Sequence, residues 1–186
     1  MRHFVRLRCR CAIKMNFLEL AKSRYSVRKF DDRTIEQEKL DLILEAGNVA
    51  PTGCNYQPQR IYVVRSQDKI EKLNALSKCI FGAKTVLLFT YNADEDWKNP
   101  FESGVRSGVQ DVSIVATHIM LAAWENGIGT CWVNYFANSK LEKELGLPEN
   151  ERAVLLMPIG YPADDAKPLE KMHGVYKDID ETVRFI

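Results

Sequence analysis

Long apolar runs, net charge and metal-ligand patterns are what this sequence has least of. No apolar run in its 186 residues approaches the ~20 residues that a membrane-spanning helix needs, so we expect no membrane partner. Its 26 basic and 25 acidic side chains leave a net charge of +1, which creates no overall field to attract nucleic acid. Any anion must therefore be bound by a local cluster of residues.

Metal-ligand spacings are missing as well. The histidines are His3, His118 and His173, and no two of them stand at ligand spacing. Cys9 and Cys11 are separated by a single residue, which is not a zinc spacing, and no second cysteine pair occurs. The five cysteines are odd in number and scattered, and we identify no secretory signal. We predict reduced thiols, no metal and a cytoplasmic protein.

Residues 1–14 form a separate basic segment without one acidic side chain. A targeting peptide would also be Ser-rich and longer, and a nucleic-acid-binding arm is an alternative. Asn16-Phe-Leu-Glu19 is typical of a helix N-cap with Glu at N3, which favours Met15 as the natural start. We expect 15–186 to form one domain with its own core, and 1–14 to be an extension outside that fold.

The hydrophobic pattern predicts alternating helices and strands. Helices are expected over 17–22, from the capping box Thr34-x-x-Gln37 to Gly47, from an Asp68 cap through Leu76, over 108–125, and from Ser139-x-x-Glu142 to Gly146. Strands are expected over 60–64, 85–91, 129–135, 153–159 and 182–186, of which 85–91 should be central and buried on both faces. The polar loop 92–107, with Trp97 and Phe101, has the character of a lid.

The glycine pattern excludes one common fold. Gly127-x-Gly129 follows a helix rather than a strand, so the sequence has no dinucleotide-binding turn. The architecture that remains is α+β, a mixed sheet covered by helices.

The loop from Pro51 to Pro58 is unusual for a connector. Its prolines restrict the backbone, Gly53 permits positive φ, and Asn55 and Gln57 each offer paired donors and acceptors. Such a loop can read the edge of a flat heterocycle. The alternative is a polar turn whose amides tie down their own backbone.

Two further segments have the composition of a binding site. Arg24, Ser26 and Arg28 would project from one side of an extended segment, where two guanidinium groups and a hydroxyl suit a phosphate; a solvated basic turn is the alternative. In Gly127-Ile-Gly-Thr-Cys-Trp132, glycine lets a backbone approach a ligand closely, although a helix stop with close packing gives the same pattern. Cys131 lies in an apolar segment and is interpreted as a core residue.

Four motifs, in this order, resemble the small members of the nitroreductase family of FMN-dependent oxidoreductases. They are Ser23-Arg-Tyr-Ser-Val-Arg-Lys-Phe30, Ala50-Pro-Thr-Gly-Cys-Asn-Tyr-Gln-Pro58, Leu121-Ala-Ala-Trp-Glu-Asn-Gly-Ile-Gly-Thr-Cys-Trp132 and Ile159-Gly-Tyr-Pro162. The similarity covers roughly residues 16–183. It implies an α+β homodimer with a mainly antiparallel sheet flanked by helices, FMN at each subunit interface, and a C-terminal segment, Asp178 to Ile186, that crosses to the partner.

The resemblance also implies which residues bind FMN. The phosphate falls to Arg24, Ser26 and Arg28, with Tyr25 alongside. The other subunit would contact the isoalloxazine and ribityl through Pro51, Thr52, Asn55 and Gln57, while Ile128 and Gly129 would lie beside the flavin. Family members often carry an Arg-Lys pair before the last acidic stretch; this chain has Tyr176-Lys177, so Lys177 inherits that phosphate contact.

The implied activity passes hydride from NADH or NADPH to FMN N5 and on to a small organic acceptor such as a nitroarene, quinone or enone. No catalytic side chain is required, because the flavin performs the hydride chemistry. A flavin-binding or redox-sensing protein without turnover is the alternative from another class. A nucleic-acid binder that uses the basic arm is a third, which the near-neutral net charge disfavours.

Overall fold

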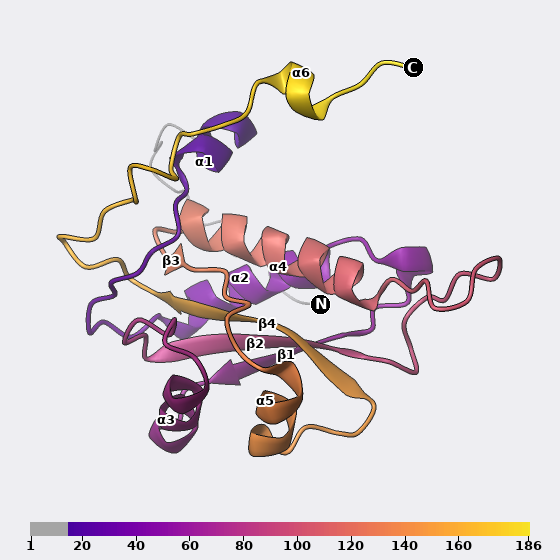
Figure 1. The fold of residues 1–186 in the computed structure, drawn as a ribbon. Coiled ribbons are helices and arrows are strands. Elements are labelled where there is room, and N and C mark those ends of the chain that lie inside the picture. The colour runs from indigo at the N-terminus through magenta and orange to yellow at the C-terminus, as the bar shows by residue number, and fades with distance from the viewer. Residues whose placement is uncertain (1–14) are drawn as a thin grey trace, which may run out of the picture.

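The computed structural model describes residues 15–186 (Figure 1). Residues 1–14, with the extension predicted there, lie outside the described part of the chain. The elements follow in the order α1 (Phe17–Ser23), α2 (Gln37–Asn48), the 3₁₀ turn η1 (Gly53–Asn55), β1 (Gln59–Val64), α3 (Gln67–Leu76), β2 (Thr85–Asn92), α4 (Gly108–Glu125), β3 (Gly129–Thr130), α5 (Asn138–Leu145), β4 (Glu151–Gly160) and α6 (Ile179–Thr182).

These strands form one antiparallel sheet in the order β1-β2-β4-β3. β2 is buried at every position except its last, because it lies between β1 and β4 and is covered on both faces. The prediction of a central strand over 85–91 is therefore confirmed. Ser26 pairs in parallel with Thr130 through an isolated bridge, and Ser26 is not part of a fifth strand.

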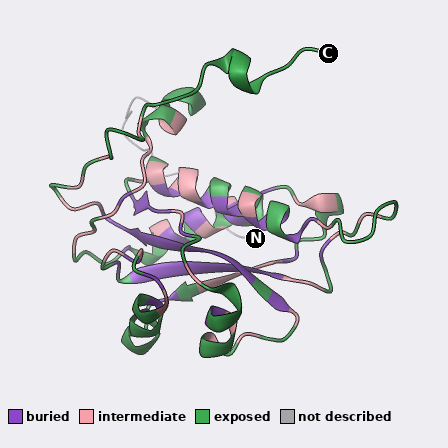
Figure 2. Cartoon of the chain, viewed as in Figure 1, coloured by how far each residue is buried: buried purple, intermediate pink, exposed green. Residues whose placement is uncertain are grey.

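Helices cover both faces of the sheet. α2 and α4 lie on one face, and α3 and α5 lie on the other (Figure 1). On the first face, Leu40 of α2 and Val115 of α4 pack with Phe89 of β2, and on the second Leu73 and Leu141 belong to a separate cluster. Figure 2 shows the buried residues concentrated in the strands between these layers. The predicted α+β class is confirmed.

Helix ends are predicted less well than helix bodies. The capping box of Asn16 and Glu19 forms as predicted, and α4 spans 108–125 as predicted. The other predicted caps, Thr34, Asp68 and Ser139, are wrong, since the residues that precede the helices are Glu36, Ser66 and Ala137. Glu142, expected to close a capping box, instead accepts the backbone N–H of Ala153 in β4 (2.8 Å). A tertiary contact competes here with the local cap.

Glycine serves two different purposes in α5 and α2. Gly146 ends α5 in the left-handed conformation (φ 66°), as predicted. Gly47 does not end α2, which continues to Asn48, so that prediction is wrong. A Cβ at Gly47 would stand 2.6 Å from Cδ1 of Ile119 in α4. This glycine allows the two helices to pack closely.

Two predicted strands are wrong in extent or in kind. The strand predicted over 129–135 is reduced to β3, followed by one bridge between Val133 and Leu156. The strand predicted over 182–186 is absent: Thr182 ends α6, and the residues after it form no strand pairing within the described chain. Figure 1 shows this C-terminal segment extending away from the sheet and its helices.

The start of α4 is fitted tightly against β2. A Cβ at Gly108 would lie 2.3 Å from Cδ2 of Tyr91, whose ring is buried. The N–H of Gly108 donates to Oδ2 of Asp96 (3.2 Å). The absence of a side chain at 108 therefore sets how closely the helix approaches the sheet.

We expect Gly108→Ala to lower the free energy of unfolding by about 1–3 kcal/mol, because the clash with the Tyr91 ring outweighs the better helix propensity of alanine. Urea denaturation measures this change. Gln110→Ala, at an exposed position of the same turn, should alter the free energy by less than about 0.5 kcal/mol. A Gly108→Ala protein as stable as wild type would contradict the tight fit.

Candidate functional site

The predicted phosphate-binding run lines a pocket. Residues 24–28 run extended beside β3: the N–H of Val27 donates to the carbonyl of Thr130 (2.9 Å), and the Val27 side chain is fully buried. Alternate side chains therefore face away from the core. They line a pocket of about 250 Å³ formed by Ala21, Arg24, Tyr25, Ser26, Arg28, Leu169, Met172, His173, Gly174 and Tyr176.

The charge in this pocket is one-sided. Among the described residues, no aspartate or glutamate lines it. Within residues 15–186, neither Arg24 nor Arg28 forms an ion pair, and Arg28 Nη1 donates only to the carbonyl of Ser26 (3.0 Å). Both arginines are half-buried. Two cations that share a concave surface without a carboxylate favour an anion with several acceptor oxygens, such as a phosphate.

Gly129 is what brings the run so close to the sheet. A Cβ at this position would stand 2.5 Å from Cγ2 and 2.9 Å from Cβ of Val27. Any larger residue would push the run outward and open the pocket. Ile128 beside it is fully buried in the core, so its side chain faces away from solvent.

Aromatic side chains also hold the basic run in place. The Tyr25 ring meets Trp124 edge to face at 5.1 Å and His173 at 6.1 Å. Trp124 Nε1 donates to Ser23 Oγ (2.9 Å), and Tyr25 Oη donates to the carbonyl of Ala166 (3.3 Å). The end of α4, the basic run and residues 166–176 thus form one packed unit.

The loop from Pro51 to Pro58 lies at the opposite end of α4. The N–H of Gly53 donates to Oδ1 of Asp111 in the first turn of α4 (2.7 Å), and Ser107 Oγ donates to Oδ2 of the same carboxylate (2.6 Å). Asp111 and Trp124 are 13 positions apart (124 − 111), which is ~20 Å along a helix. The two predicted halves of the site do not come together within one chain.

This loop has an uncommon backbone. Cys54, Asn55 and Gln57 have φ values of 49°, 59° and 52°, the left-handed region that favours glycine. Non-glycine residues held there cost of order 1–3 kcal/mol each and are typical of ligand-binding segments. The N–H of Gln57 donates to Thr52 Oγ1 (3.0 Å) and its Nε2 to the carbonyl of Asn55 (3.2 Å), so the loop does tie down its own backbone.

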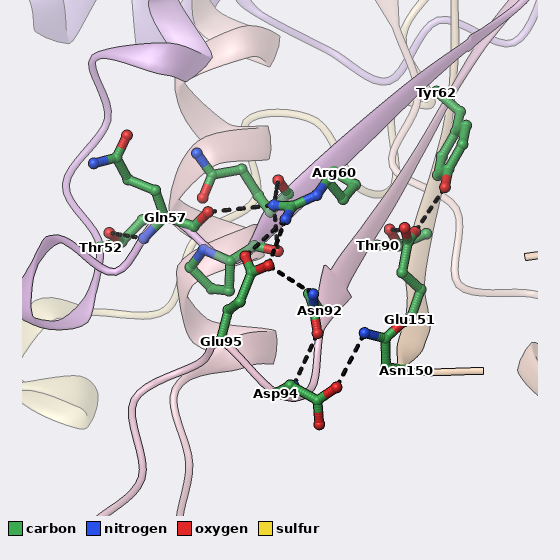
Figure 3. Close-up of polar contacts among 12 residues, drawn as sticks. Thr52, Gln57, Arg60, Tyr62, Thr90, Asn92, Asp94, Glu95, Asn150 and Glu151 are labelled. Atoms are coloured by element: carbon green, nitrogen blue, oxygen red, sulfur yellow. Dashed lines mark hydrogen bonds and ion pairs between the residues drawn. The ribbon is translucent and has the colours of Figure 1, made fainter. Parts of the chain in front are cut away.

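Some polar groups of the loop remain available to a ligand. Asn55 is exposed, and its side-chain amide has no hydrogen-bond partner among residues 15–186. Pro51 is also exposed, while Thr52 is half-buried. Beyond the loop, Arg60 Nη2 contacts both carboxylate oxygens of Glu95 (2.9 and 2.7 Å), as Figure 3 shows. This ion pair fixes the path by which the loop enters β1.

The predicted lid neighbours the loop. Trp97 packs there, since a Cβ at Gly53 would stand 3.3 Å from the Trp97 Cβ, whereas Phe101 is 96% exposed. At the base of this segment Arg106 pairs with the fully buried carboxylate of Asp96. Burial alone would raise the pKa of Asp96, but the hydrogen bonds and charge of Arg106 outweigh burial and lower it. Asp96 therefore stays ionised and holds the start of this segment in place, while Phe101 at its tip is exposed to solvent.

Two other predicted residues lie apart from the pocket lining. Lys177 is exposed and does not line the pocket, although its neighbour Tyr176 does. Cys131 is buried, as expected of a core residue, and burial raises the pKa of its thiol. A thiol held protonated is a poor nucleophile.

His173 and Tyr176 are lining residues that the sequence did not single out for the site. They lie more than 140 positions after the basic run, and no local pattern links the two segments. In the described range, no group of three or more His, Cys, Asp or Glu side chains is placed to hold a metal ion. No helix of that range is long and apolar enough to cross a membrane.

A family model described as "Nitroreductase family" matches residues 21–81 and 72–161 of the chain. The basic run, the loop and α4 all fall within the matched residues. The segment 169–176 that completes the pocket lies after them.

Similar proteins have the same fold. A nitroreductase family protein from Clostridium difficile 630 is 36% identical, with a TM-score of 0.85 over 92% of this chain and 98% of that one. An "FMN-dependent Nitroreductase" from Clostridium difficile R20291 is 27% identical, with a TM-score of 0.71 over 91% and 98% of the two chains. A Methanothermobacter thermautotrophicus protein named "Putative NADH dehydrogenase/NAD(P)H nitroreductase" is 29% identical over 82% of this chain and 80% of its own length.

We expect Asp111→Ala to lower the free energy of unfolding by about 1–3 kcal/mol, because Gly53 N–H and Ser107 Oγ both lose their buried acceptor. Amide hydrogen exchange should then accelerate at residues 53–57 before the rest of the chain. Glu38→Ala, an exposed acidic residue in the first turn of α2, is the control. Unchanged exchange in the loop of Asp111→Ala would show that the loop is anchored elsewhere.

Proposed function

This chain belongs to the nitroreductase family, and from that premise we propose that it is an FMN-dependent oxidoreductase. It would take hydride from NADH or NADPH and pass it to a small organic acceptor such as a nitroarene, a quinone or an enone. The names of the similar proteins support a nicotinamide donor and FMN.

The observation that carries this proposal is the one-sided charge around Arg24 and Arg28. A neutral cofactor would leave two half-buried arginines without counter-charge, whereas the FMN phosphate supplies about −1.5 to −2 charges and three acceptor oxygens. Gly129 also supports this assignment, because a Cβ at position 129 would displace the run that carries both arginines. The residues present therefore suit FMN.

Each part of the chain has a physical task in this proposal. Arg24, Arg28 and the Ser26 hydroxyl bind the phosphate and so fix one end of the cofactor. Asn55 and Gln57 offer amide donors to the pyrimidine edge of the ring. FMN, when bound, supplies hydride transfer through its N5 atom. The protein orients the ring and excludes water, and none of its side chains need carry a proton in the transfer.

We propose that the active unit is a homodimer. The loop and the pocket lie at opposite ends of α4, so a second copy would bring its loop to this pocket. β1 is an edge strand, and the segment from Asp178 to Ile186 projects with exposed apolar side chains at Ile179, Val183, Phe185 and Ile186. Exposed apolar residues on a projecting segment are typical of one that packs on a partner. Segment exchange would cover them.

The purified protein tests both parts of the proposal. We expect a yellow dimer by visible absorbance and light scattering, bleached anaerobically by NADH or NADPH and recoloured by a nitroarene, quinone or enone. A yellow protein that neither nicotinamide bleaches would support flavin binding without turnover. A colourless protein that FMN cannot reconstitute would overturn the cofactor assignment, and a yellow monomer would overturn the shared site.

Arg24→Ala should weaken FMN binding by about 10- to 100-fold, the range expected when a charge-assisted hydrogen bond is lost. Lys177→Ala should weaken it by less than about threefold, because Lys177 does not line the pocket. Fluorescence titration of FMN into flavin-free protein measures both values. Equal losses in the two variants would refute the assignment of the phosphate to the pocket.

A further inference from the structure

Part of the pocket lining is contributed by residues 169–176. Backbone N–H groups of Met172 and His173 both donate to the carbonyl of Leu169 (2.9 and 2.8 Å), which closes a tight turn. Gly174 follows with φ 75° and redirects the chain. This turn places His173 and Tyr176 in the lining of the pocket that Arg24 and Arg28 also line.

His173 is held in place but its polar atoms are not used by the protein. Its ring meets Tyr25 edge to face with an interplanar angle of 70°, which fixes where the imidazole lies. The residue is half-buried, and across residues 15–186 no protein group hydrogen-bonds to either ring nitrogen. An imidazole oriented by its edge contact therefore keeps its N–H free for a ligand.

The surrounding charges decide what that ligand is. Arg24 and Arg28 from the run, Tyr25 beside the ring and Tyr176 from the same segment are the titratable groups that line the pocket with His173. None of these titratable groups is acidic, so the imidazole has no carboxylate partner among them. An anion is the ligand that could accept from both guanidinium groups and from the imidazole N–H.

We propose that His173 is a phosphate-binding residue of this pocket. The proposal rests on the FMN function above and extends it: the basic run binds the phosphate, and His173, which lines the same pocket from a segment distant in sequence, donates a hydrogen bond to one of its oxygens. A phosphate has three strong acceptor oxygens, so it can accept from the imidazole as well as from both arginines. His173 thereby supplies, from within the pocket lining, the contact that the family resemblance implies for Lys177.

Two substitutions separate hydrogen bonding from packing. His173→Phe keeps an aromatic ring against Tyr25 but has no donor. His173→Gln keeps a donor but has no ring to pack. His118→Phe, the same change at an exposed histidine of α4 that does not line the pocket, is the control. Each full-length variant is stripped of flavin and titrated with FMN and with riboflavin, which is FMN without its phosphate.

For His173→Phe we expect the Kd of FMN to rise by about 5- to 20-fold and that of riboflavin to change by less than about twofold. His173→Gln should lose less FMN affinity than His173→Phe, and His118→Phe should leave both values unchanged. This pattern supports the proposal, because packing alone cannot distinguish the two flavins.

Equal losses of FMN and riboflavin affinity, or unchanged FMN affinity in His173→Phe, would overturn the role of His173 while leaving FMN as the cofactor. Wild-type protein that binds neither flavin would overturn the proposed function itself, and this inference with it. The two failures are distinguished by the wild-type titration alone.

Discussion

The close passage of Val27 over Gly129 is the constraint on which the site depends. One hydrogen bond, from Val27 N–H to the Thr130 carbonyl, ties the N-terminal run to the end of the sheet, and a side chain at 129 would prevent it. Because Val27 must enter the core at this point, the residues on either side of it must face outward. The pairing that completes the fold therefore also sets the direction of both arginines.

Helix α4 determines where the remaining functional groups lie. One side of its middle is buried against the sheet and α2, so it cannot shift without disturbing the core. Its ends carry polar anchors: Asp111 binds the loop at Gly53, and Trp124 binds the run at Ser23. A rigid helix with an anchor at each end keeps the two halves of the proposed site at a fixed separation, which is why a single chain does not complete it.

Much of this architecture is predictable from local pattern. Residues 108–125 have apolar side chains at helical spacing with Asn126-Gly127 after them, and the apolar run in β2 needs burial on both faces whatever surrounds it. The direction of Arg24, Ser26 and Arg28 follows from the two-residue period of an extended chain. Features that depend on contacts distant in sequence are not predictable in this way. Glu142 accepts a hydrogen bond from β4 instead of capping its own helix, and Gly47 allows α4 to pack closely against α2. His173 lies in the same pocket as the arginines only in the folded chain, so no sequence motif predicts it for the site.

The separation of loop and pocket has a genetic consequence in the proposed dimer. Suppose that one copy of the chain carries a defective loop and the other a defective pocket. Each of the two sites draws its pocket from one copy and its loop from the other, so one site of the mixed dimer collects both defects and the other collects none. Two inactive alleles expressed together would then restore activity at half of the sites of each mixed dimer, although neither allele alone yields a working enzyme.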